Sequence, residues 1–242
     1  MKKTNPIVEQ PRALLPAEPE QDRRVPIRRE EIVMLANPRG QIAEQFRGLR
    51  NSIHALNPDG ASRTIVMTSA LPQEGKTVAA INLAVCMAEL PSQHVLLLDA
   101  NLHRPAIEEY IDLGRRQGLA EVLGGRLPLD GALRPTSIHG LWVMGAGELP
   151  ANPSEWLGSE RMRTVLHQLK QQFSYILIDT PEALTISDAS LLGAMADGIL
   201  LVVRLGKTPR HFVEQAHNQL EALGGNVLGT CLTCASIRDT SA

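Results

Sequence analysis

The stretch Ser69-Ala70-Leu71-Pro72-Gln73-Glu74-Gly75-Lys76-Thr77 decides the fold of this chain. An apolar segment, residues 64–68, precedes it, and a second apolar run follows it as far as residue 90. A strand, a loop and a helix that starts at Gly-Lys-Thr are the context that a phosphate-binding loop (P-loop) requires. The sequence therefore predicts that this stretch binds the phosphates of a nucleotide.

The expected phosphate contacts come from the backbone of the loop and from two side chains. Backbone N–H groups of the loop and of the first helical turn point at the phosphates, and the helix dipole adds to the attraction. Lys76 brings a positive charge to the β- and γ-phosphate oxygens, and the Thr77 hydroxyl is a magnesium ligand. The residues expected to surround ATP are Pro72, Gln73, Glu74, Gly75, Lys76, Thr77 and Val78.

One position departs from the general pattern of such loops, which has glycine where Ala70 stands. Alanine is tolerated there if its φ angle stays negative, because only a positive φ strongly favours glycine. The P-loop prediction therefore requires a negative φ angle at Ala70.

From residue 64 onward, short apolar strands alternate with amphipathic helices. Most strands are apolar at every position, which is typical of a sheet covered on both faces. This alternation predicts an α/β fold: a doubly wound, mostly parallel sheet with helices on both faces. The expected strands are 64–68, 95–98, 141–144, 175–178, 199–203 and 227–232, and the expected helices are 41–56, 77–90, 160–173, 189–195 and 209–223.

Two of these strands are followed directly by an aspartate, Asp99 and Asp179. Ligands of doubly wound sheets bind beyond the carboxyl ends of the strands, so both acids are expected beside the mouth of the phosphate loop. Magnesium takes oxygen ligands and keeps several waters, so one or two carboxylates suffice. We predict Thr77, Asp99 and Asp179 as magnesium ligands, and Lys76, Asp99 and Asp179 as the catalytic residues.

Composition excludes several classes of function. The 242 residues are 43% hydrophobic, enough for the core of one α/β domain. A net charge of -2 and an aromatic content of 3% argue against nucleic acid as the main partner. The longest apolar run, 78–90, is interrupted by polar residues and is too short to span a bilayer. We expect a cytoplasmic protein without direct membrane insertion, recruited to a membrane only through a partner.

The three cysteines, Cys86, Cys231 and Cys234, are few and odd in number, which argues against a disulfide framework. Cys231 and Cys234 form a C-x-x-C, but a redox or metal site would need a second ligand pair or a helix after the first cysteine. Because 227–232 has the pattern of a buried strand, we favour a structural role.

The chain divides into a domain and two tails. Residues 1–40 hold six of the sixteen prolines and show no apolar periodicity, which predicts a flexible tail. Residues 41–235 form the predicted P-loop domain, and 236–242 a short C-terminal tail.

The helix expected at 41–56 has an apolar stripe at helical spacing. Glu44, Arg47 and Arg50 lie on another of its faces, at i, i+3 and i+6. From the residues alone, this is a solvated face with an i,i+3 ion pair.

Several motifs together resemble the bacterial tyrosine kinases of capsule and exopolysaccharide systems, relatives of the MinD and ParA P-loop ATPases. The loop 69–77 is similar to the family's S-x-x-P-G-E-G-K-[ST], and 96–105 to its second acidic motif, D-x-D-L-R-R-P after apolar residues. Residues 175–181 resemble its Walker B segment, and 44–50 its E-x-x-R-x-x-R helix. Further matches lie at 147–155 and 203–208, so the resemblance runs from about residue 38 to residue 234.

This resemblance implies a function and partners. Members of the family bind ATP with magnesium and are activated by a membrane co-polymerase that sets polysaccharide chain length. They phosphorylate a C-terminal tyrosine cluster, chiefly in a neighbouring subunit. Their E-x-x-R-x-x-R helix mediates ring-like self-association, so Glu44, Arg47 and Arg50 are expected to be oligomer contacts. The chain is thus expected to act in exopolysaccharide or capsule synthesis or export, as a homo-oligomer with such a membrane partner.

Four positions depart from the family pattern. Asn101 stands where the second carboxylate of the acidic motif belongs, and an amide cannot accept a proton. Phosphoryl transfer should therefore be slow if that acid activates the tyrosine hydroxyl or orders the magnesium shell. In addition, His103 replaces an arginine, Gln73 replaces a loop glycine, and Thr233 replaces an asparagine that contacts the base.

The chain also has no tyrosine cluster. Its two tyrosines are Tyr110 and Tyr175, and Tyr175 begins an expected buried strand. Conventional autophosphorylation of a C-terminal tail is therefore excluded.

Three functions remain open at this point. The first is a weakly or conventionally active kinase-like ATPase with other proteins as targets. The second is a pseudokinase, an ATP-dependent assembly or regulatory module without phosphotransfer. The third is a MinD- or ParA-like positioning ATPase, which ranks last because 69–71 lacks the second lysine of that group and no C-terminal amphipathic membrane helix is found.

Overall fold

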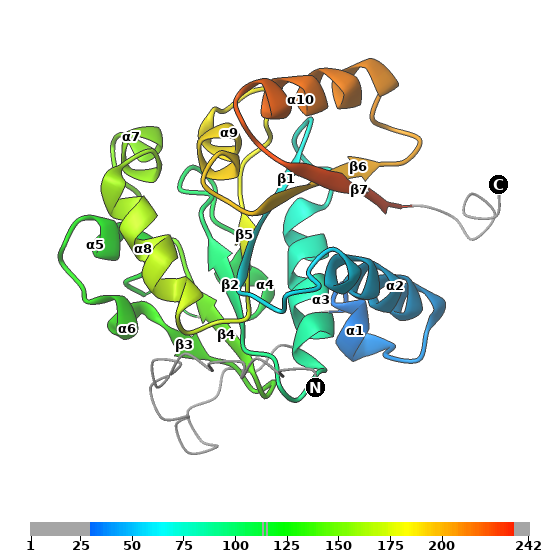
Figure 1. Cartoon of the computed structure of the whole chain (residues 1–242), viewed down its shortest axis with the longest axis horizontal. Helices are drawn as coiled ribbons and strands as arrows, with labels where there is room; N and C mark the ends of the chain where they lie inside the picture. Colours follow the sequence, from blue (N-terminus) through cyan, green and yellow to red (C-terminus); the bar gives the residue numbers. More distant parts are fainter. Residues whose placement is uncertain (1–29, 113, 115, 235–242) are drawn as a thin grey trace, which may run out of the picture.

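A computed structural model of the chain describes residues 30–112, 114 and 116–234. Within them, seven strands form one sheet in the order β3-β4-β2-β5-β1-β6-β7 (Figure 1). Neighbouring strands are parallel except for β3 and β4, which are antiparallel. The predicted α/β fold with a mostly parallel sheet is confirmed. The strands are β1 (Arg63–Ser69), β2 (Val95–Asp99), β3 (Arg134–Pro135), β4 (Leu141–Met144), β5 (Tyr175–Asp179), β6 (Gly198–Arg204) and β7 (Val227–Thr233).

The central strands are apolar at successive positions because both faces of the sheet are buried. Side chains alternate between the faces along a strand. Val66 and Ile176 accordingly belong to one hydrophobic core, while Ile65 and Leu177 belong to a second core. The strand pattern read from the sequence is therefore that of a sheet between two layers of helices.

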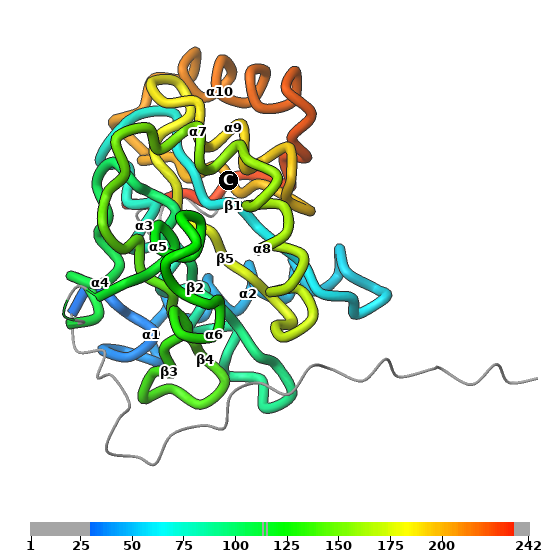
Figure 2. Tube along the Cα trace, turned by 90° about the vertical axis from the view of Figure 1, so that its left-hand side faces the viewer, coloured from blue at the N-terminus to red at the C-terminus, as the bar shows by residue number. Residues whose placement is uncertain are grey.

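Helices cover both faces of the sheet (Figures 1 and 2). On one face, α3 (Lys76–Ala88) packs against β1, β2 and β5. On the other face, α8 (Glu160–Lys170) packs against β1 and β5. The remaining helices of the described part are α1 (Val33–Ala36), α2 (Gln41–Ala55), α4 (Ile107–Tyr110), α5 (Leu119–Leu123), α6 (Leu129–Ala132), α7 (Pro153–Leu157), α9 (Asp188–Gly193) and α10 (Arg210–Ala222).

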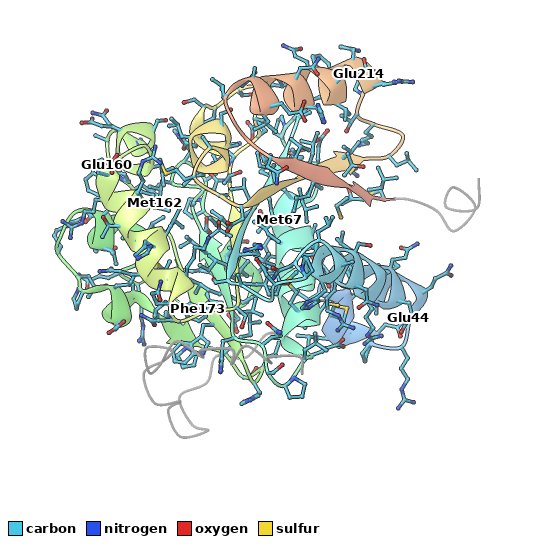
Figure 3. The ribbon with its side chains drawn as sticks, viewed as in Figure 1. Glu44, Met67, Glu160, Met162, Phe173 and Glu214 are labelled. Carbon is cyan, nitrogen blue, oxygen red and sulfur yellow. The ribbon has the colours of Figure 1, made fainter. Side chains whose placement is uncertain are left out.

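The amphipathic pattern of α8 shows how a helix is fixed to the sheet. Met162 is buried in the core, and Phe173, just beyond the helix, is buried as well. The Glu160 side chain is 90% exposed at the first turn, where a negative charge suits the helix dipole. In Figure 3, Glu160 lies at the periphery, and Met162 and Phe173 lie closer to the middle of the molecule.

The structure corrects the predicted start of the domain. A flexible tail was expected through residue 40, but α1 lies within this range, and Ile32 and Met34 are buried. The Asn82 side chain of α3 holds this segment: its Oδ1 accepts from the Met34 N–H (3.1 Å), and its Nδ2 donates to the Glu31 carbonyl (3.1 Å). A short helix anchored by one buried amide leaves little periodicity to read in a sequence. Residues 1–29 and 236–242 of the predicted tails lie outside the described residues.

The five predicted helices all occur, each ending one to three residues earlier than expected. The five short helices α1, α4, α5, α6 and α7 and the two-residue strand β3 were not predicted. Over the described residues, none of the helices combines the length and the apolarity that a bilayer crossing requires.

Candidate nucleotide-binding site

The predicted site residues meet at the carboxyl edge of the sheet. β1 ends at Ser69, directly before the loop, and its neighbour β5 ends at Asp179. β2 lies on the other side of β5, with Asp99 in register with Asp179. Adjacent strands lie about 4.8 Å apart, so both carboxylates stand beside the loop, as the strand pattern predicted.

The loop between β1 and α3 uses two positive φ angles. Gly75 precedes α3 with φ 87°, and a Cβ there would lie 3.5 Å from the Thr233 side chain. Gln73 has φ 61°, which explains why the family pattern has glycine at this position. Ala70 is buried and is not among the described residues with positive φ, as its tolerance requires.

Glu74, predicted as a nucleotide-binding residue, has a side chain that turns inward and shapes the loop. Its carboxylate is buried and accepts from the backbone N–H groups of Ala70 (3.1 Å) and Leu71 (3.3 Å). The Thr208 hydroxyl donates to its other oxygen. Glu74 thereby satisfies donors that the tight turn would otherwise leave buried without partners.

Two further residues brace the loop from its β6 and β7 side. Arg204 donates to the Gln73 carbonyl at 3.2 Å, and the Thr233 hydroxyl donates to the Glu74 carbonyl at 2.7 Å. The hydroxyl of Thr233, expected near the base, is therefore engaged with the loop. The resemblance at 203–208 thus corresponds to contacts that support the phosphate loop.

The residues predicted to hold magnesium are arranged to accept a cation. The Thr77 hydroxyl donates to Asp179 Oδ2 at 2.6 Å. Asp179 is fully buried, and its Oδ1 has no hydrogen-bond partner. A buried carboxylate oxygen without a partner, next to a hydroxyl and to a loop that would hold phosphates, fits a hard divalent cation.

Asp99 has a different set of contacts. Oδ1 accepts from the N–H of Asn101 (3.1 Å), and Oδ2 accepts from the N–H groups of Ala106 and Ile107 (both 3.0 Å). The carboxylate thus holds the loop between β2 and α4, and it is less free than Asp179 to bind metal directly. Asn101 Oδ1 accepts from the Arg104 N–H (3.0 Å), so its amide oxygen also serves this loop.

Burial is the first cause that raises the pKa of both acids above the usual carboxyl range. For Asp99, the nearby Asp179 charge raises the pKa further, and the three backbone donors oppose the shift. For Asp179, the Thr77 hydroxyl and the Lys76 charge oppose the effect of burial. In the absence of a cation the pair therefore favours protonation.

A residue that the sequence reading missed, Glu182, faces the predicted phosphate lysine. Its Oε2 lies 3.7 Å from Lys76 Nζ, and the two side chains are 15% and 10% exposed. Glu182 comes three residues after Asp179, just beyond the segment that resembles a Walker B. The sequence signal that could have identified Glu182 was therefore an acidic residue directly after the Walker B-like segment.

The remaining departure from the family pattern, His103, contacts the buried carboxylate of Asp188. His103 Nε2 lies 3.1 Å from Asp188 Oδ2, and the Ser154 hydroxyl donates to the other oxygen of Asp188. The serine contacts the carboxylate and not the imidazole, so this trio is not arranged to activate a nucleophile.

Tyr175 is buried, and its hydroxyl contacts Asn57 Nδ2 at 3.0 Å.

A cavity of about 360 Å³ opens beside the loop on its β6 and β7 side. Its lining combines Gly75 and Val78 with Arg204 and Thr233, and α2 contributes Phe46. Asp179, which accepts the Thr77 hydroxyl, lies on the opposite side of β1, at the end of β5. The cavity is therefore placed to take the nucleoside of a nucleotide whose phosphates run along the loop.

The residues predicted as oligomer contacts form ion pairs within the chain. Arg47 contacts Glu44 (2.6 Å) and makes two contacts with Glu89, the residue that follows α3 (2.6 and 3.0 Å). Arg50 also contacts Glu89 (3.0 Å) and donates to the Cys86 carbonyl (2.9 Å). Both arginines thus fix α2 to α3, whereas the Glu44 side chain is 64% exposed. Figure 3 shows Glu44 at the outer side of α2.

Comparison with known proteins identifies the family. The chain is 31% identical over 201 residues to the tyrosine-protein kinase YwqD of Bacillus subtilis, which covers 83% of this chain and 84% of YwqD. The chain belongs to the bacterial tyrosine-protein kinases. Another member of this kinase family, ptk of Acinetobacter johnsonii, is 31% identical over 224 residues, 91% of this chain but 30% of that protein. The chain thus spans less than a third of the length of such larger relatives.

Solved structures agree with this family assignment. The kinase domain of the Escherichia coli tyrosine kinase ETK matches with a TM-score of 0.79 and 31% identity over 85% of this chain and 82% of that one. MinD of Pyrococcus horikoshii, solved with Mg-ADP, matches with a TM-score of 0.62 and 22% identity over 74% and 73% of the two chains. At that identity the match shows the common fold alone. No family model matches the chain.

We expect the protein without nucleotide and metal to lose stability as the pH rises from about 5 to about 8. Because the folded-state pKa of Asp99 and Asp179 is raised, the folded state binds more protons than the unfolded chain in this range. The stabilisation is present at low pH and is lost as the pH rises through the folded-state pKa. Thermal unfolding measured against pH checks this. The melting temperature of Asp179→Asn should fall less steeply with pH than that of the wild type. A wild-type melting temperature that rises between about pH 5 and about pH 8 would contradict the prediction.

Proposed function

We propose that this chain binds ATP with magnesium and acts as the kinase-like ATPase module of an exopolysaccharide or capsule system. The observation that carries the proposal is the Thr77–Asp179 contact, with the partnerless Asp179 Oδ1 beside the loop that ends in Lys76. Membership of the tyrosine kinase family supports ATP as the nucleotide. The name CapB for a Staphylococcus aureus relative, 29% identical, is in keeping with a capsule-related role.

The proposed roles of the site residues follow from their placement. Lys76 neutralises the β- and γ-phosphate oxygens, and backbone N–H groups from Gly75 to Val78 approach the phosphates at the start of α3. Thr77 and Asp179 would hold magnesium directly, and Asp99 would contribute through its charge and through water, because its oxygens already accept three N–H groups. When bound, magnesium would neutralise part of the phosphate charge.

The partners are proposed by family resemblance. A membrane polysaccharide co-polymerase would recruit the chain to the inner face of the cell membrane from the cytoplasm. Self-association would use α2, on which Glu44 is the exposed member of the family's E-x-x-R-x-x-R motif. Arg47 and Arg50 would support that surface from within by fixing α2 to α3.

A second candidate, a pseudokinase that binds ATP but transfers no phosphoryl group, is favoured by two observations. The Asn101 amide can accept no proton, and its oxygen is engaged by the Arg104 N–H. Tyr175 is also buried. In that case nucleotide binding would control assembly or docking on the membrane partner.

Titration calorimetry with ATP, ADP and GTP, with and without magnesium, tests the nucleotide assignment. We expect Mg-ATP binding, and loss of measurable binding in Lys76→Met, because the charge at the β- and γ-phosphates is removed. The control Arg163→Met removes a positive charge from the exposed side of α8 and should bind like the wild type. Equal affinity of wild type and Lys76→Met would contradict the site.

An Asn101→Asp variant separates the two candidates. Its carboxylate can still accept from the Arg104 N–H, so the loop should keep its structure. If a missing proton acceptor limits the chemistry, ATP turnover should rise by about tenfold or more. ADP release, followed in a coupled assay, is the measurement. Unchanged turnover would show that Asn101 is not the limiting residue.

A Glu44→Ala variant tests the assembly surface. We expect a smaller assembly by light scattering and a stability within about 0.5 kcal/mol of the wild type, because surface changes of this kind have small effects. Arg50→Ala should instead lower the melting temperature, since it breaks the contacts of α2 with Glu89 and the Cys86 carbonyl. An unchanged assembly mass in Glu44→Ala would exclude this residue as an intersubunit contact.

A further inference from the structure

Glu182 is held in place by the backbone on both sides of it. The Thr180 N–H donates to the Met67 carbonyl (3.2 Å), and the Ala183 N–H donates to the Ser69 carbonyl (2.8 Å). The segment after β5 therefore runs along the end of β1, where the phosphate loop begins. Gln219 of α10 adds a third anchor, because its side chain donates to the Ala183 carbonyl (2.9 Å). The position of Glu182 is thus fixed by the fold.

The Glu182 carboxylate already forms an ion pair with Lys76, the lysine that the phosphates of a nucleotide would need. Glu182 Oε2 and Lys76 Nζ are 3.7 Å apart, and both side chains are at least 85% buried. At this depth the attraction between the two charges is screened less than at a surface. A nucleotide phosphate must therefore share Lys76 with Glu182 or displace it.

We propose that Glu182 sets the selectivity of the site, so that a triphosphate binds well only as its magnesium complex. This inference rests on the proposed function of the loop as an ATP site. Glu182 neutralises Lys76 in the nucleotide-free protein and repels phosphate oxygens that approach the lysine. The repulsion is greatest for metal-free ATP, which carries the most negative charge.

Magnesium relieves this repulsion in two ways. It neutralises part of the triphosphate charge, and it draws the phosphates toward Thr77 and Asp179, where Asp179 Oδ1 has no other partner. The repulsion between the Glu182 carboxylate and the phosphate oxygens then falls, and Lys76 can contact the phosphates. Mg-ADP lacks the γ-phosphate, so Glu182 should affect its binding least.

Glu182 could instead act in the chemical step, by accepting a proton from the group that attacks the γ-phosphate. That role predicts a lower turnover and an unchanged affinity when the charge is removed. The selectivity role predicts a higher affinity. Binding measurements therefore decide between the two without relying on activity.

The test compares wild type, Glu182→Gln and Glu182→Ala by titration calorimetry with ATP in EDTA, ATP with Mg²⁺, and ADP with Mg²⁺. Removing the carboxylate should lower the dissociation constant of metal-free ATP by about tenfold or more. The dissociation constant of Mg-ATP should fall by less, and that of Mg-ADP least. Both variants should show the same order, although they fill the space differently. The control Glu160→Gln removes an exposed charge on α8 and should match the wild type for all three ligands.

The outcomes separate this inference from the proposed function. If wild type binds Mg-ATP and Lys76→Met does not, but Glu182→Gln and Glu182→Ala bind metal-free ATP no more tightly than wild type, the role of Glu182 is overturned and the nucleotide site stands. A fall in turnover at unchanged affinity also overturns it. If wild type, Lys76→Met and both Glu182 variants bind none of the three ligands, the proposed function itself fails.

Discussion

The path of the chain from β1 to α3 depends on one buried carboxylate. Glu74 accepts the N–H groups of Ala70 and Leu71 and the hydroxyl of Thr208, and so fixes the turn from inside. Without those acceptors the buried donors of the turn would have no partners, a cost of roughly 1–3 kcal/mol for each. Because Glu74 faces inward, the backbone that follows it, from Gly75 onward, is free to face a ligand. The position of Lys76 and Thr77 is a consequence of this turn.

The site also has an imbalance of charge that a cation would correct. Asp99 and Asp179 are buried side by side, and Lys76 interacts with both Asp179 and Glu182. Without a cation, the pair reduces its charge by holding a proton, because the pKa of both carboxyls is raised and that of Asp99 is raised more. With magnesium, both could be ionised at no such cost. The same residues that make the nucleotide-free state unfavourable at neutral pH thus create the affinity for a divalent cation.

Sequence alone was sufficient for six of the seven strands in the described residues, for the loop and for the acids at the strand ends, because each depends on local pattern. Continuous apolar strands and the Gly75-Lys76-Thr77 triplet carry their own signals. Glu182 could not be found in this way, since its contact with Lys76 exists only after β5 is placed beside β1. The inward direction of Glu74 and the anchoring of α1 by Asn82 likewise depend on partners distant in sequence.

The second acidic motif shows how a family scaffold can lose one carboxylate and keep its shape. Asp99 holds the loop after β2 through three N–H groups, and Asn101 caps the same loop through the Arg104 N–H. The amide serves this structural role as well as a carboxylate would, because only an acceptor oxygen is needed. What differs between the two side chains is the ability to take a proton, which the loop does not use. The structural role of position 101 therefore needs only an acceptor oxygen, whereas the catalytic role proposed for this position would need a group that can take a proton.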